Sequence, residues 1–137
     1  MNRTVLALVD DLFWRTKIDH AVKSTSSPLV FLSDPSELAA AAAHPQSVGV
    51  LVVDLALRKE PFDAIAKLKK SPKTKEIAVI GYYEHVRKDL QQKGVAAGCD
   101  EVLPRSSFSE KLGDLVLKYV MPGSSRAVDE EPELPEE

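Results

Sequence analysis

Two groups of aspartates in this chain stand where apolar segments end. Asp10 and Asp11 follow the apolar run Thr4–Val9. Asp54 follows a second run, Val48–Val53. Carboxylates that lie close together raise one another's pKa unless a cation lies between them. A hard divalent cation such as Mg²⁺, held by one or two carboxylates, a backbone carbonyl and waters, relieves that repulsion. The pattern predicts a Mg²⁺ site if the two apolar runs are neighbours.

The acidic pair has a second interpretation, as the start of a helix. A helix is expected over Leu12–Lys23, because Ile18 and Val22 recur at helical spacing. Aspartates at a helix N-terminus accept hydrogen bonds from its free backbone N–H groups. Taken alone, the pair favours this capping role; the third aspartate at the end of another run favours the metal site.

The remaining elements alternate between strand-like and helical patterns. Asp34 and Glu37 flank Pro35 in the order that typically begins a helix, and Ser107 with Glu110 forms a second capping box. The expected strands are Thr4–Val9, Pro28–Leu32, Val48–Val53, Ile77–Tyr82 and Glu101–Leu103. The expected helices are Leu12–Lys23, an alanine-rich helix from Pro35 to before Pro45, Pro61–Lys70, Val86–Ala97 ending at Gly98, and a last one after Ser107.

Five strand-then-helix units with mostly all-apolar strands predict a parallel sheet that helices cover on both faces. Right-handed crossovers then give an α/β, flavodoxin-like, doubly wound sheet with strand order 2-1-3-4-5 in a three-layer α/β/α arrangement. Ligands of such sheets bind beyond the carboxyl ends of the strands, where strands 1 and 3 are adjacent. The three aspartates are expected at that point.

Charge divides the chain into two parts. Residues 122–137 carry six acidic side chains against one arginine, a net charge of −5, so that residues 1–121 carry +2 of the total of −3. The acidic segment has few apolar side chains, and we expect it to be a disordered tail that follows one domain over residues 1–121. A nearly neutral domain gives no support to nucleic-acid binding. No apolar run approaches the roughly 20 residues of a membrane helix, and a cytoplasmic protein is expected.

The motifs LALVDD, VLVVD, IAVIGYY and AAGCDEVLPRSSF together resemble the receiver domain of two-component response regulators. The resemblance covers Thr4 to about Val120. It implies that Asp10 and Asp11 hold Mg²⁺ with Asp54 and the backbone carbonyl of Ala56. It also implies that Asp54 accepts a phosphoryl group from a histidine kinase or another phosphodonor protein.

The chain departs from the receiver pattern at two further positions. The family ends strand 4 with Thr or Ser, where Tyr83 stands in this sequence, followed by Glu84. The family's lysine at the end of strand 5 is Arg105 here, which follows Pro104 instead of preceding a proline. A guanidinium still pairs with a phosphoryl oxygen, although its geometry differs from that of an ammonium.

Two functions from different classes follow. The first is a single-domain receiver, not itself an enzyme, that takes a phosphoryl group on Asp54 with Mg²⁺ and signals to a downstream protein. The second is a pseudo-receiver that serves as a phosphorylation-independent interaction or dimerisation module. A small flavin or phosphatase protein of similar fold is disfavoured, because no glycine-rich phosphate loop follows strand 1.

Overall fold

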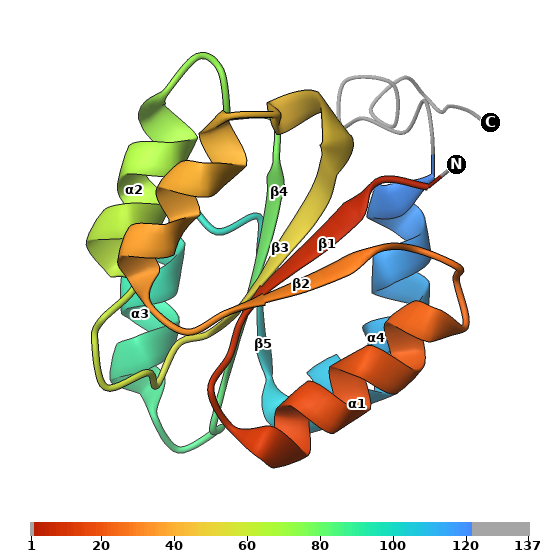
Figure 1. Ribbon diagram of the computed structural model, residues 1–137. Helices are drawn as coiled ribbons and strands as arrows, with labels where there is room; N and C mark the ends of the chain where they lie inside the picture. The colour runs from red at the N-terminus through yellow and green to blue at the C-terminus, as the bar shows by residue number, and fades with distance from the viewer. Residues whose placement is uncertain (1, 122–137) are drawn as a thin grey trace, which may run out of the picture.

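A computed structural model describes residues 2–121, without the side chains of residues 40–42, and the predicted tail lies outside the described residues. Five parallel strands form one sheet in the order β2-β1-β3-β4-β5, which confirms the predicted fold (Figure 1). The strands are β1 (Thr4–Leu8), β2 (Leu29–Leu32), β3 (Val48–Asp54), β4 (Ala78–Tyr83) and β5 (Glu101–Pro104).

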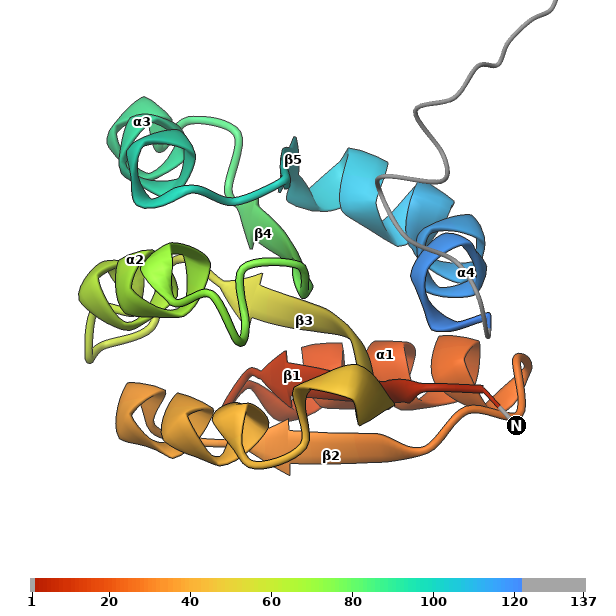
Figure 2. The same ribbon diagram turned by 90° about the horizontal axis from the view of Figure 1, so that it is seen from above.

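Helices cover both faces of the sheet (Figure 2). The α-helices are α1 (Leu12–Lys23), α2 (Phe62–Lys70), α3 (Lys88–Ala97) and α4 (Arg105–Val120), and the 3₁₀ helices are η1 (Pro35–Ala42) and η2 (Pro45–Ser47). α1 and α4 lie on one face, and α2, α3 and η1 on the other. Within residues 2–121, no helix is long and apolar enough to cross a membrane.

The core consists of two apolar layers, one on each side of the sheet. Alternate residues of the central strands supply the two layers, because successive side chains of a strand point to opposite faces. Val50 and Val52 pack with Ile18 of α1 and Val116 of α4. On the opposite face, Leu51 and Val53 of β3 pack with Ile65 and Leu68 of α2. The central strands β1, β3 and β4 are therefore buried on both faces, as the sequence indicated, whereas the edge strands β2 and β5 are only partly buried.

The alanine-rich segment is not the predicted α-helix. Residues Pro35–Ala42 form a 3₁₀ helix, although alanine has the highest α-helical propensity of all residues. The predicted capping contacts nevertheless form: Glu37 Oε1 accepts hydrogen bonds from the backbone N–H groups of Ser33 and Asp34, at 2.8 and 2.9 Å. The predicted helix start is therefore correct, but the helix type is not. Capping residues and alanine propensity do not decide whether the hydrogen bonds that follow are those of an α-helix or of a 3₁₀ helix.

The last helix also begins earlier than predicted. α4 starts at Arg105, directly after Pro104, and no side chain caps its N-terminus. Ser107 and Glu110, the predicted capping box, therefore lie inside the helix. The predicted end of α3 at Gly98 is confirmed. Gly98 has a φ of 105°, a left-handed conformation that glycine adopts without strain.

Candidate functional site

The three aspartates lie at the carboxyl edge of two adjacent strands. Asp54 is the last residue of β3, and Asp10 and Asp11 follow β1, whose Leu8 pairs with Val53. Asp10 and Asp11 are exposed, whereas Asp54 is half-buried. The strand order therefore brings the acidic pair and the third aspartate to one place, at the switch point of the sheet.

Asp54 is held in a tight local turn. Its Oδ1 atom accepts a hydrogen bond of 2.9 Å from the backbone N–H of Ala56, two residues later. Burial raises the pKa of the Asp54 carboxyl, and the negative charges of Asp10 and Asp11 raise it further. The Ala56 N–H and the positive charge of Arg105 oppose this rise. The charged form of Asp54 is thus disfavoured in the folded domain unless a cation joins the site.

An Asp54→Asn variant should for this reason be more stable than the wild type at neutral pH. A raised folded-state pKa means that ionised Asp54 costs stability above that pKa, while below the unfolded value of 3.8 the carboxyl is protonated in both states. We expect a melting temperature higher by about 2–5 °C at about pH 7 without divalent cations. The difference should shrink towards about pH 3.5, as measured by thermal unfolding across pH. An equal difference at both pH values would contradict the raised pKa.

Asp11 acts as the N-cap of α1. Its Oδ1 atom accepts a hydrogen bond of 3.2 Å from the backbone N–H of Trp14, which is the capping role that the sequence left open. Within residues 2–121, no three His, Cys, Asp or Glu side chains are grouped closely enough to form a metal centre by themselves. Mg²⁺ commonly needs only one or two protein carboxylates and keeps several waters. The oxygen donors of Asp10 and Asp54 fit such an ion, and so does the raised pKa of Asp54, which burial causes first and the charges of Asp10 and Asp11 increase.

Tyr83 does not face this site. Its side chain is buried in the layer beneath α2 and α3, together with Leu55 and Leu90. The neighbouring Tyr82 pairs with Asp54 in the β3–β4 register and lies on the same face of the sheet as Trp14 and Phe108. Tyr83, the predicted residue, therefore lies on the face away from Asp54, and Tyr82 is the tyrosine on which the charges of the aspartates act. The sequence count missed this because two adjacent tyrosines differ only in the face to which they point.

The residue after β4 and the first residue of α4 carry opposite charges near the site. Arg105, the first residue of α4, forms an ion pair of 3.7 Å with Glu84, which follows β4. Both side chains are about half exposed. The positive charge of Arg105 thus acts on two carboxylates, those of Glu84 and Asp54.

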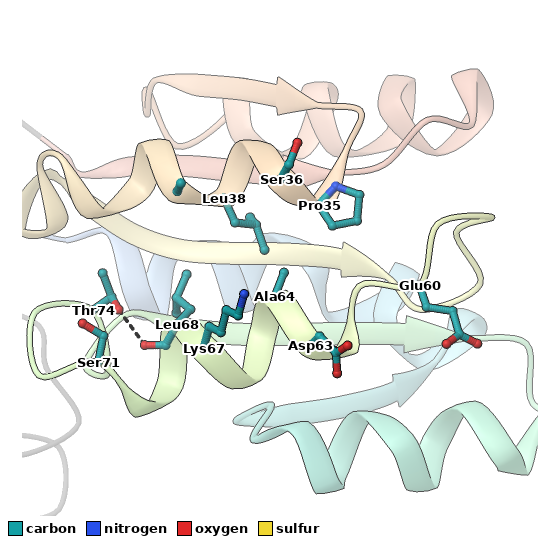
Figure 3. Close-up of a pocket in the computed structure, with 11 residues that line it drawn as sticks. Pro35, Ser36, Leu38, Glu60, Asp63, Ala64, Lys67, Leu68, Ser71 and Thr74 are labelled. Carbon is teal, nitrogen blue, oxygen red and sulfur yellow. Dashed lines mark hydrogen bonds between the residues drawn. The ribbon is translucent and has the colours of Figure 1, made fainter.

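The surface has a cleft beside Asp10 and a larger groove elsewhere. A cleft of about 360 Å³ beside Asp10 is lined further by Ser33, Asp34, Leu57, Arg58 and Lys59, and Lys59 forms an ion pair with Asp34. A larger groove of about 540 Å³ lies between η1 and α2 (Figure 3). Its floor is apolar, with Leu38 and Leu68, and the hydroxyl of Thr74 donates a hydrogen bond to the Leu68 carbonyl at one end. That groove contains none of the site residues.

Comparisons with known proteins point to one fold. No family model and no curated protein matches the sequence. Solved structures do match. CheY4, a chemotaxis response regulator of Vibrio cholerae, is 18% identical with a TM-score of 0.69, over 85% of this chain and 99% of that one. A phosphorylated cyanobacterial phytochrome response regulator, RcpA, is 18% identical with a TM-score of 0.68, over 85% and 89%.

A third match carries a metal ion. The receiver domain of a sensor histidine kinase from Pseudomonas aeruginosa, crystallised with magnesium in its active-site cleft, is 12% identical with a TM-score of 0.73. The alignment covers 87% of this chain and 98% of that domain. Identities this low establish the fold and leave the roles of individual residues open. The chain has the fold of response regulator receiver domains.

Proposed function

We propose that the protein acts as a receiver that accepts a phosphoryl group on Asp54 and signals through protein contacts. The observation that carries the proposal is the setting of Asp54, a half-buried carboxylate at the switch point. The negative charges of Asp10 and Asp11 and the positive charge of Arg105 all act on this carboxylate. Carboxylates that could hold a cation, together with a guanidinium whose charge acts on Asp54, suit phosphoryl transfer, in which charge spreads over the phosphoryl oxygens.

In the proposed reaction, a carboxylate oxygen of Asp54 attacks the phosphorus of a phosphohistidine or an acyl phosphate. A new P–O bond forms as the P–N or P–O bond to the donor breaks, and the electron pair leaves with the donor. Bound Mg²⁺, held through Asp10 and Asp54, would supply the charge neutralisation that a second anion at this place requires. Arg105 would pair with a phosphoryl oxygen in place of the family's lysine. The protein is then a substrate of its phosphodonor and not itself an enzyme.

The partners that this function requires are a histidine kinase or phosphodonor protein and a downstream target. We place the target-binding surface on α3, β5 and α4, where Val95 and Leu117 are exposed apolar residues. A complex with the target, or a homodimer, would cover them.

The direct test is phosphoryl uptake by the full chain. Incubation with acetyl phosphate and millimolar Mg²⁺ should add one phosphoryl group, read by intact-protein mass spectrometry. Beryllofluoride, which mimics an aspartyl phosphate, should shift the amide resonances of Asp54 and its neighbours. A chain that takes up no phosphoryl group and does not respond to beryllofluoride would contradict the proposal.

A pseudo-receiver is the second candidate, and the ion pair at the rim favours it. Glu84 holds Arg105 at 3.7 Å and places a negative charge where a phosphodonor must approach. Under this alternative, the fold acts as a constitutive interaction or dimerisation module. An Asp54→Ala chain would then bind the same partner as the wild type with unchanged affinity.

Glu84→Gln tests whether the ion pair between Glu84 and Arg105 slows phosphoryl uptake. Removing the charge releases Arg105 and lowers the repulsion of an incoming anion, so we expect uptake of the phosphoryl group about three- to fivefold faster. Initial rates with acetyl phosphate at low ionic strength measure this. Glu60→Gln is the matched control, since Glu60 forms a similar surface ion pair of 3.6 Å with Lys93, and its rate should equal that of the wild type. A slower Glu84→Gln chain would show that Glu84 assists the reaction.

A further inference from the structure

The groove between η1 and α2 combines an apolar floor with a positive charge. Leu38 and Leu68 form the floor, and Ala39 and Ala64 line the walls (Figure 3). The side chain of Lys67 reaches into the groove from α2. An open apolar floor beside a cation fits an extended segment that carries both apolar and acidic side chains.

Three exposed lysines make one end of this groove basic. Lys67 and Lys70 belong to the last turn of α2, and Lys73 follows it. The chain then enters β4 at Ala78, so this end of the groove lies at the amino edge of the sheet, where the strands begin. None of the three lysines forms an ion pair with a carboxylate in the described part of the chain. Lys69, in the same turn, is by contrast held in a largely buried ion pair of 2.8 Å.

The helix dipole accounts for the position of these lysines but not for their number. The C-terminus of a helix carries about half of a negative charge, which favours a cation in the last turn. Three lysines exceed that charge, so most of their positive charge is left uncompensated. An acidic ligand could therefore bind them.

The acidic segment of this chain has the complementary composition. Residues 129–137 read DEEPELPEE, with six carboxylates around Leu134. Pro132 and Pro135 favour an extended backbone over a helix. A segment with too few apolar side chains to form a core of its own can still bind to a surface that is already folded.

The first strand residues of β3 connect the end of α4 with the groove. A Cβ atom at Gly49 would meet the carbonyl oxygen of Tyr119 at 2.6 Å, so α4 ends beside the amino end of β3. The preceding residue, Val48, belongs to the opposite apolar layer, together with Leu38 and Leu68. The end of α4 and the basic end of the groove thus lie at the same edge of the sheet, on opposite faces (Figure 2).

The chain beyond α4 is long enough to cross this edge. The path from one helix layer to the other is about 20 Å if each layer is about 10 Å thick. Asp129 is eight residues beyond Met121, and that length of extended chain spans up to about 26 Å. Such a tether keeps the segment near the groove at an effective concentration of the order of millimolar, so a contact with a dissociation constant of about 1 mM is half occupied. Individually weak ion pairs are therefore sufficient.

We propose that residues 129–137 dock in the groove between η1 and α2 of the same chain. Their carboxylates pair with Lys67, Lys70 and Lys73, and Leu134 covers the apolar floor. The docked segment closes the groove to other ligands. The inference goes beyond the proposed phosphoryl transfer and does not depend on it, because the aspartates lie at the opposite, carboxyl edge of the sheet.

A spin label in the acidic segment tests this contact in the full chain. Glu136→Cys in a Cys99→Ser background leaves a single cysteine to carry a nitroxide. At low ionic strength, the amide signals of Leu38, Lys67 and Thr74 should fall to less than about half of those in the same chain with the nitroxide reduced. High salt should restore these signals, because screening weakens contacts between exposed charges.

Charge reversal at the basic end should release the segment. In the chain with Lys67→Glu and Lys70→Glu, we expect the signal loss in the groove to fall at least about threefold. Both side chains are exposed, so the fold should be kept, and the amide spectrum itself verifies this. Lys88→Glu with Lys111→Glu is the matched control. It reverses two exposed lysines of α3 and α4 outside the groove and should leave the signal loss unchanged.

Three results would overturn the proposal. The first is a signal loss confined to the surroundings of Met121, with none in the groove. The second is a loss in the groove that the charge reversal at Lys67 and Lys70 does not reduce. The third comes from mixing nitroxide-labelled chains with isotope-labelled chains that carry no nitroxide: a loss in the groove of the latter would mean that the segment docks on a second copy. None of these results depends on phosphoryl uptake, so the receiver function is tested separately.

Discussion

An Asp54→Asn chain is expected to take up no phosphoryl group from acetyl phosphate, under conditions in which the wild type takes up one. The amide of asparagine has nearly the shape of the carboxylate but no anionic oxygen to attack phosphorus. The variant also loses a ligand for Mg²⁺. We expect a loss of at least about 100-fold in the rate of uptake, measured by intact-protein mass after incubation with Mg²⁺.

Two controls make the loss interpretable. Asp114→Asn changes an exposed carboxylate of α4 away from the site and should leave uptake unchanged. Asp54→Asn should itself remain folded. It should be somewhat more stable than the wild type at neutral pH, because the raised pKa of the Asp54 carboxyl means that its charged form destabilises the folded wild type. Uptake of one phosphoryl group by Asp54→Asn would show that another residue is the acceptor, and would refute the assignment of Asp54.

Gly49→Ala is expected to cause the largest loss of stability of any methyl-sized change proposed for this chain. A Cβ atom at Gly49 of β3 would lie 2.6 Å from the carbonyl oxygen of Tyr119 and 3.0 Å from the Cα of Val120. Both obstacles are backbone atoms at the end of α4. Arg3 donates hydrogen bonds to the carbonyl oxygens of the same two residues, at 2.8 Å to Tyr119 and 2.7 Å to Val120. The added methyl group must push the end of α4 off the sheet.

We expect Gly49→Ala to lower the free energy of unfolding by about 2–4 kcal/mol and the melting temperature by about 10 °C. Gly113→Ala is the matched control, since a Cβ at Gly113 in α4 meets nothing within 4 Å. Alanine is a better helix former than glycine, so this control should gain about 0.5–1 kcal/mol. Urea unfolding of the three chains measures both values. A Gly49→Ala chain as stable as the wild type would show that α4 shifts without cost.

The sequence predicted the position of the three aspartates, because that position depends only on where the strands end and on their order. Apolar strands without polar alternation require cover on both faces, which fixes a doubly wound parallel sheet and places Asp10, Asp11 and Asp54 at one edge. The predicted N-terminus of α1 was correct as well, since Asp11 caps it. Each of these inferences uses residues that are near one another in sequence, or a topological rule that holds for the whole class of fold.

The failed predictions all concern a choice between near-equal local arrangements. Ser107 and Glu110 match a capping box, yet α4 begins two residues before Ser107, because β5 ends at Pro104 and the helix follows at once. Pro35–Ala42 has the composition of an α-helix and forms a 3₁₀ helix. In each case the local sequence fits more than one helical start or register and does not decide between them.

The sequence by itself determined the strand order, the edge at which the aspartates meet and the residues that can carry charge there. Only the tertiary structure decided on which tyrosine the charges of the aspartates act. Tyr82 and Tyr83 are chemically identical neighbours, and a shift of one residue in the β3–β4 register would exchange them. Pairing of Tyr82 with Asp54, and the aromatic rings of α1 and α4 on that face, fix the choice. Those contacts join residues far apart in the chain, and no local pattern records them.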